Sequence, residues 1–307
     1  GLEAYKVHGG DPAIAEAFAY YFEHDAKGQL LHYGQHLRVP GRPTDAENNY
    51  GNAYLIAYRN GYMTGNDADA LDMSFSRAGT WKIRPESAYV YAAAASAAEL
   101  YELIGNTQKA NEMNVLASRI RADALEYLWS DNNKTFQSYA VSPQSGFQGN
   151  DPDKPNLIPG KTNNHYNFFS TLLVPTDPES LERYSPAFEY FIYADEYPIF
   201  PCYTANQRDV ALYGSGSNNF SNINFTLQAR AYEAALRYYD PEHRYVTPEM
   251  LSMLVAWQAF EVFPSVNGSG NTLYPNNNEY FWGWNKNTKT YSRSGIYHDT
   301  LGNYNYI

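Results

Sequence analysis

Residues 89–129 read YVYAAAASAAELYELIGNTQKANEMNVLASRIRADALEYLW and predict two consecutive helices. The first, Tyr89 to Ile104, is rich in alanine, which suits a helix packed tightly between neighbours, and Gly105 fits the position after its end. The second, Gln108 to Trp129, carries apolar residues every three to five positions, the spacing of one helix face. The short connection makes the two helices an antiparallel hairpin.

Further helices are predicted on both sides of this hairpin, with Asp11-Pro12 opening the first of them as N-cap and first helical residue. They cover residues 11–28, 50–63, 165–173, 177–192, 220–239 and 247–263. Residues 30–34 and 136–141 are expected to be extended, and the tail at 291–302 alternates as a strand pair does. About eight helices in sequential pairs predict one all-α domain over residues 1–307, built as an arc or ring of stacked hairpins.

The composition points to neutral polar ligands and away from nucleic acid. The net charge is −11 and the pI about 5.1, and no Lys/Arg cluster offers a phosphate-binding surface. Charged residues make up only 18% of the chain, whereas 30 positions are tyrosine. No apolar run is long enough to cross a membrane. Cys202 is the single cysteine, so no intrachain disulfide can form, and the compartment stays open, with a periplasmic or extracellular location as the expectation.

Two polar segments carry the candidate chemistry. Residues 276–284 place Glu279 between three asparagines and four large aromatics, the groups that bind sugar hydroxyls and cover the apolar face of a pyranose ring. The alternative is an Asn-rich turn followed by a core strand. Residues 66–84 lack a regular period and carry Asp72 among apolar neighbours and two further aspartates. Such surroundings raise the pKa of a carboxyl group, although a solvated turn aspartate explains the same pattern.

Glycosidic bond hydrolysis needs two such carboxyl groups, one protonated and one ionised. Asp72 suits the acid, and Glu279, held by amide donors, suits the base. Asp45 and Glu47 could line the same cleft, although acidic residues at a helix start are the better explanation of this pair. His32 and His36 are four residues apart without an obvious third ligand, so no metal site and no cofactor are expected.

Several segments resemble a known family. Residues 69–74 and 81–91, DALDMS and WKIRPESAYVY, look like the acid-bearing loop and following helix of (α/α)6-toroid glycoside hydrolases related to mannosylglycerate hydrolase, processing α-glucosidase I and trehalase. Residues 278–280, NEY, fall where this family has its catalytic glutamate. The resemblance implies Asp72 as general acid and Glu279 as general base, with inversion at the anomeric carbon. The chain departs from the family at 217–220 and after Glu279, which leaves the sugar open.

The polar and aromatic residues of these segments are the candidate substrate-binding residues. They are Asp45, Glu47, Arg84, Tyr89, Asn219, Asn222, Tyr280, Trp282, Trp284, Arg293 and His298. Six hairpins need twelve helices, so we expect this chain to be an incomplete toroid with a small β-hairpin and long loop insertions. It would then be the C-terminal portion of a longer enzyme, with an oligosaccharide or glycoside substrate and other domains of the same polypeptide as partners. The alternatives are a non-catalytic helical carbohydrate-binding protein of a polysaccharide-utilisation system, and a helical scaffold whose aromatics are simply core.

Overall fold

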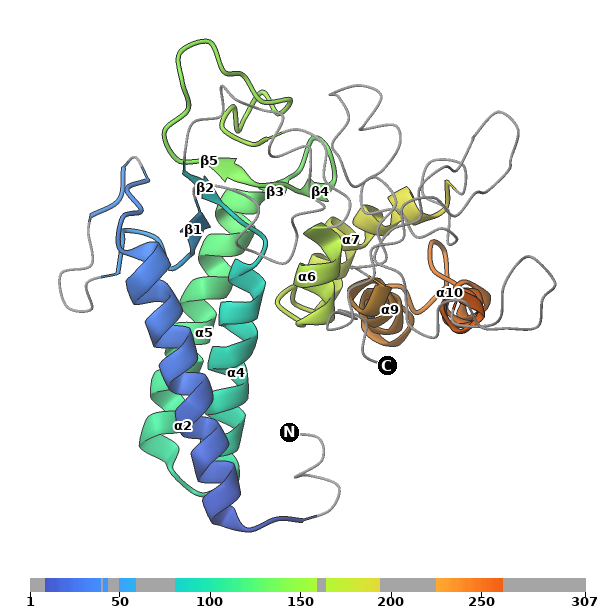
Figure 1. Cartoon of the computed structure of the whole chain (residues 1–307). Coiled ribbons are helices and arrows are strands. Elements are labelled where there is room, and N and C mark those ends of the chain that lie inside the picture. Colours follow the sequence, from blue (N-terminus) through green and yellow to red (C-terminus); the bar gives the residue numbers. More distant parts are fainter. Residues whose placement is uncertain are drawn as a thin grey trace, which may run out of the picture.

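Three long helices form one side of the molecule (Figure 1). They are α2 (Pro12–Gln29), α4 (Ser87–Leu103) and α5 (Thr107–Leu128). The computed structural model describes residues 9–39, 41–43, 50–58, 81–158, 164–193 and 225–261. The predicted hairpin of α4 and α5 is confirmed, and Gly105 between them has a φ of +78°, a conformation that favours glycine. The Asp11 cap is confirmed too, since its carboxylate accepts the Ala13 N–H at 2.9 Å.

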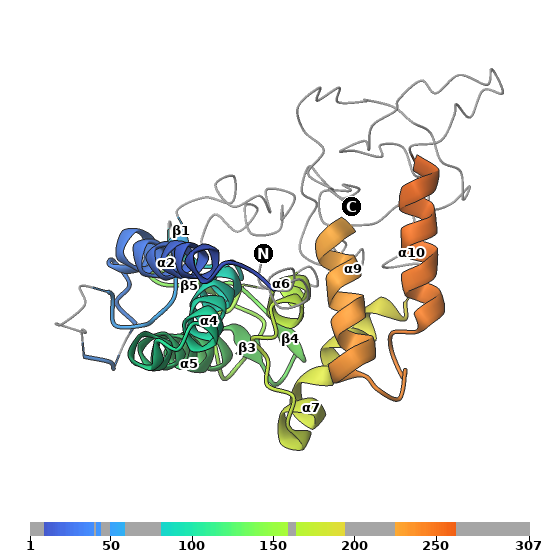
Figure 2. The ribbon, with the colours of Figure 1, turned by 90° about the horizontal axis from the view of Figure 1, so that it is seen from below.

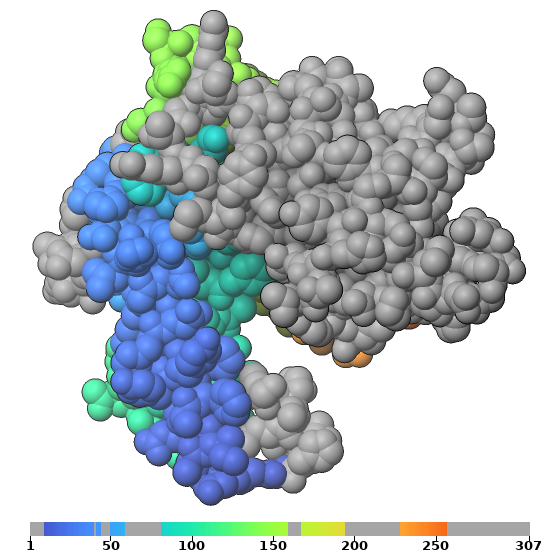
Figure 3. Space-filling model, viewed as in Figure 1, coloured from blue at the N-terminus to red at the C-terminus, as the bar shows by residue number. Residues whose placement is uncertain are grey.

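Alanine lets these helices approach closely. Helix α4 contacts both α2 and α5, and the three are seen nearly end-on in Figure 2. Ala94 and Ala97 of α4 and Ala19 and Ala26 of α2 are fully buried. Side chains this small leave little room for voids when two helix backbones come together. The alanine-rich composition of α4 thus has the packing role expected of it. In Figure 3, α2 (blue) covers most of the visible face of this three-helix group.

A second group of helices lies beside the first (Figures 1 and 2). It comprises α6 (Asn164–Ser170), α7 (Pro178–Tyr184), the 3-10 helix η4 (Ser185–Phe191), α9 (Phe225–Ala234), the π-helix η6 (Ala235–Tyr239) and α10 (Pro248–Glu261). Helix α9 contacts α6 on one side and α10 on the other. Each of these helices overlaps a predicted one, although Pro186 converts the second half of the 177–192 helix to the 3-10 form.

Two short sheets lie at one end of α4 and α5 (Figure 1). Strands β1 (Ala57–Tyr58), β2 (Lys82–Ile83) and β5 (Tyr139–Ala140) form an antiparallel sheet in the order β1-β2-β5, with Tyr58 opposite Lys82. Strands β3 (Trp129–Ser130) and β4 (Thr135–Phe136) form a two-stranded ladder. The described residues are therefore mostly helical with small sheets, as the sequence pattern predicts.

Buried aromatic rings connect the two helical groups. The Phe136 ring of β4 stacks on the Phe168 ring of α6, with centroids 4.1 Å apart. The Phe169 ring lies 4.4 Å from Phe188 and 4.8 Å from Tyr239. Because these rings come from four elements, β4, α6, η4 and η6, they form one core shared by both groups.

Two local predictions are wrong. Residues 30–34 are not extended but form the π-helix η1 (Leu30–Gly34), which continues α2. Residues 50–58, expected to begin a helix, form a turn that leads into β1. The physical reason is close packing, because a Cβ on Gly51 would lie 2.4 Å from the carbonyl oxygen of Gly34. The backbone here follows the fit against η1, and not local helix propensity. The predicted strand pair at 291–302 lies outside the described residues.

Among the described helices, none combines the length and the apolar character needed to span a bilayer.

Candidate functional site

Arg84 and Tyr89 are the predicted site residues that the structure describes; both belong to the segment that opens α4. The others lie outside the described residues: Asp72 and Glu279 as acid and base, and Asp45, Glu47, Asn219, Asn222, Tyr280, Trp282, Trp284, Arg293 and His298 as substrate-binding candidates. The surroundings of Arg84 and Tyr89 therefore define the candidate site.

Arg84 is a buried cation in the turn between β2 and α4, with 1% of its surface exposed. Its Nε lies 3.6 Å from the carboxylate of Glu86, which is also buried. Its backbone N–H donates to the carbonyl of Ile56 at 3.3 Å, and the Ser87 hydroxyl accepts the Ile56 N–H at 3.1 Å. The turn is thus fastened to β1, and the Arg84 charge holds the Glu86 carboxylate in place.

A polar pocket opens beside this turn. Its volume is about 160 Å³, and its walls come from the end of α2, from β1 and from the start of α4. The lining residues are Asp25, Gln29, Ile56, Tyr58, Glu86, Tyr89 and Val90. Two carboxylates, a carboxamide and two phenols on a small apolar floor are groups that can bind a polyhydroxylated ligand.

Tyr89 is the exposed wall of the pocket. Its hydroxyl donates to Oδ1 of Asn167 on α6 at 2.7 Å, while 39% of the residue remains exposed. Asn167 itself is fully buried, and its amide nitrogen has no hydrogen-bond partner among the residues that the structure describes. Anchoring the hydroxyl fixes the ring and leaves its open part available to a ligand.

Both phenols of the pocket are neutral at physiological pH. Burial raises the pKa of Tyr58 and of Tyr89, and the nearby Glu86 carboxylate raises each pKa further. The Tyr58 ring packs against the Tyr33 ring, with ring centroids 4.7 Å apart. Protonated phenols in fixed positions can donate hydrogen bonds and offer ring faces, but they do not act as bases.

Most residues of this pocket were not predicted from the sequence. Asp25 and Gln29 are one helical turn apart on α2 and have the pattern of an ordinary solvated face. Glu86 fitted a helix start, and its position after the WKIRP segment was the one available signal. Tyr58 and Asn167 come from segments far away in sequence, so only the fold brings them to Tyr89.

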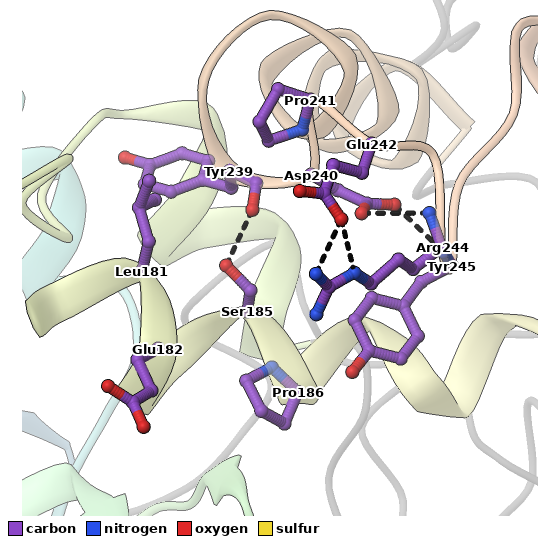
Figure 4. A pocket seen from close by; sticks show the side chains of 10 residues that line it. All are labelled: Leu181, Glu182, Ser185, Pro186, Tyr239, Asp240, Pro241, Glu242, Arg244 and Tyr245. Carbon is purple, nitrogen blue, oxygen red and sulfur yellow. Dashed lines mark hydrogen bonds and ion pairs between the residues drawn. The ribbon is translucent and has the colours of Figure 1, made fainter. Parts of the chain in front are cut away.

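A larger pocket of about 310 Å³ lies between η4 and the turn that follows η6 (Figure 4). Its polar groups form hydrogen bonds and ion pairs that stabilise the turn itself. The Asp240 carboxylate accepts the backbone N–H groups of Arg244, Tyr245 and Val246 at 2.8–2.9 Å. The Arg244 side chain pairs with exposed Glu242, and the Ser185 hydroxyl donates to the Tyr239 carbonyl at 2.5 Å. We therefore regard the smaller pocket at α4 as the candidate functional site.

No family model matches this chain. A solved structure with the name sialidase is similar to it, with 12% sequence identity and a TM-score of 0.56. The match covers 89% of this chain and 22% of that one, so this chain spans about a fifth of that protein's length. At this identity the likeness shows a shared fold.

Proposed function

We propose that this chain is the catalytic (α/α)6-toroid part of a glycoside hydrolase that inverts the anomeric carbon. Asp72 is the general acid and Glu279 the general base. The observation that carries the proposal is that the segment bearing Asp72 begins directly after a residue of the candidate pocket and ends beside the strand that pairs with that residue. It follows Tyr58, a pocket residue, and rejoins the described chain at Trp81, next to Lys82, which pairs with Tyr58 across β1 and β2.

Two further findings support the proposal. The residues after this segment, 81–91, are those that resemble the helix following the acid loop in the toroid glycosidases. Most of this chain also shares its fold with part of a protein that is named as a glycosidase. Neither finding depends on the pocket, so the three lines of support are separate.

The reaction follows from the roles of the two carboxyl groups. Asp72 donates its proton to the glycosidic oxygen as the bond from that oxygen to the anomeric carbon breaks. Glu279 takes a proton from a water whose oxygen attacks the same carbon from the opposite face. The products are a free alcohol and a sugar with inverted configuration. Room for the water requires the two carboxyl groups to be about 6.5–9.5 Å apart.

Hydrolysis of a panel of aryl glycosides and oligosaccharides tests the proposal. We expect Asp72→Asn and Glu279→Gln each to lower kcat by about 10²–10⁴-fold. The matched control is Asp69→Asn in the same segment, which should change kcat by less than about threefold. Proton NMR of the first product formed should show the inverted anomer. Full activity in either variant, or a retained anomer, would contradict the assignment. Sugar binding without any turnover would instead identify a carbohydrate-binding protein.

A further inference from the structure

We propose that the pocket between α2, β1 and α4 is a subsite for an uncharged sugar residue, and that it disfavours sugars carrying a carboxylate, such as uronic and sialic acids. This inference rests on the proposed function and specifies its substrate class. One solved structure that shares the fold is named a sialidase, so the inference distinguishes this chain from that protein by the charge of the sugar.

The charges that line the pocket are negative. Asp25 and Glu86 contribute carboxylates, and none of its lining residues in the described part of the chain is basic. Proteins bind sugar carboxylates mainly through Arg, whose guanidinium donates two parallel hydrogen bonds to the anion. Arg84 is the nearest candidate by sequence, but it is buried against Glu86 and does not line the pocket.

Two cations near the pocket act against the carboxylates. Arg84 lowers the pKa of Tyr58, and Arg230, exposed on α9, lowers the pKa of Tyr89, but Glu86 has the larger effect on each tyrosine and raises both pKa values. At the pocket tyrosines, the Glu86 carboxylate therefore has the larger electrostatic effect. Asp25 and Gln29 line the pocket from α2, where Asp25 adds a second carboxylate. A ligand carboxylate entering the pocket would lie near Asp25 and Glu86 with no basic residue among the lining residues to pair with, which is unfavourable.

Neutral hydroxyl groups fit the same walls well. The Asp25 carboxylate accepts hydrogen bonds, and the Gln29 carboxamide both accepts and donates them. These two side chains share one weak contact, 3.4 Å from Gln29 Nε2 to Asp25 Oδ1, which a sugar hydroxyl could replace. In the same pocket, the anchored Tyr89 ring offers a partly exposed surface to the apolar side of a pyranose. The polar and apolar faces of a neutral sugar are thus both matched.

The probes for the test are 4-nitrophenyl hexosides and the corresponding 4-nitrophenyl hexuronides, which differ only by a carboxylate at C6. Binding is measured by saturation-transfer NMR on the full chain carrying Glu279→Gln, and kcat/KM is measured on the chain without that change. We expect hexosides to be favoured over hexuronides by about tenfold or more. Asp25→Asn should reduce this preference about threefold to tenfold. Glu16→Gln, an exposed site on the same helix, should leave it unchanged.

Substitution of Tyr89 provides a second, independent test of the subsite. Tyr89→Ala should weaken hexoside binding about tenfold, while Tyr89→Phe, which keeps the ring, should weaken it less than threefold. Far-UV circular dichroism of each variant confirms that the helices are intact.

The outcomes separate the two proposals. Binding that depends on Tyr89, without hydrolysis, supports the subsite and rejects the hydrolase. Hydrolysis in which Asp25→Asn leaves the charge preference unchanged and Tyr89→Ala leaves hexoside binding unchanged rejects the subsite and keeps the hydrolase. Equal or better use of hexuronides, or binding of no sugar at all, also overturns the subsite.

Discussion

Glu23 is a buried carboxylate that joins all three long helices. Only 3% of it is exposed, and it accepts hydrogen bonds from Lys27 of its own helix at 2.7 Å, from Lys109 at 2.6 Å and from the Tyr101 hydroxyl at 2.6 Å. Burial alone would raise the pKa of Glu23, but these three hydrogen bonds outweigh it and lower the pKa from 4.5 to about 2. A single side chain thereby ties α2 to both α4 and α5.

The lowered pKa makes this contribution to stability dependent on pH. Above about pH 4.5 the carboxylate is ionised in both the folded and the unfolded chain, and its full contribution of about 3 kcal/mol is present. As the pH falls from 4.5 towards 2, the unfolded chain takes up the proton first, and the contribution is lost. We expect Glu23→Gln to lower the free energy of unfolding at pH 7 by about 2–4 kcal/mol and to flatten its decline between pH 5 and 3.

Urea unfolding at a series of pH values measures both effects. Glu16→Gln, an exposed position on the same helix, is the control and should change the free energy by less than about 0.5 kcal/mol. An unchanged pH profile in Glu23→Gln would show that the carboxylate is not held as the structure has it.

At the scale of elements, Gly51 and Gly28 make opposite predictions for the same substitution. A Cβ on Gly51 would lie 2.4 Å from the Gly34 carbonyl oxygen and 2.7 Å from the Leu37 carbonyl oxygen, and backbone atoms cannot move aside cheaply. Gly28 lies in α2 with nothing within 4 Å of the added atom. We expect Gly51→Ala to destabilise the protein by about 2 kcal/mol or more, and Gly28→Ala to stabilise it by up to about 1 kcal/mol. Thermal unfolding of both variants decides this, and a harmless Gly51→Ala would mean that η1 and the 50–58 turn are not in contact.

The same turn shows which elements a sequence can predict. Helices α2, α4 and α5 were predictable because caps, alanine content and apolar spacing are local properties that agree with their packing. The 50–58 segment was not, since its conformation depends on a fit against Gly34 and on pairing with β2, more than twenty residues further on. The pocket was missed for the same reason, as Asp25 and Tyr89 become neighbours only through the packing of α2 on α4.

For the whole molecule, the shared aromatic core predicts one cooperative unfolding transition. Phe169 is fully buried, and its ring contacts Phe136 from the three-helix side as well as Phe188 and Tyr239 from the other. Truncating it leaves a cavity between the two helical groups. We expect Phe169→Ala to cost about 3–5 kcal/mol and to lower the melting temperature by about 5–10 °C, with a single transition retained.

Calorimetry, together with far-UV and near-UV circular dichroism, tests this cooperativity. Far-UV signals report the helices of both groups and near-UV signals report the packed rings, so the melting curves should coincide in the wild type and in Phe169→Ala. The matched control is Phe18→Ala on α2, where 42% of the residue is exposed and the loss should be below about 1 kcal/mol. Two separate transitions in Phe169→Ala would mean that the groups unfold independently. The pocket draws walls from the three-helix group, and Tyr89 is anchored there by Asn167 of the second group, so its geometry would then depend on the docking of two units.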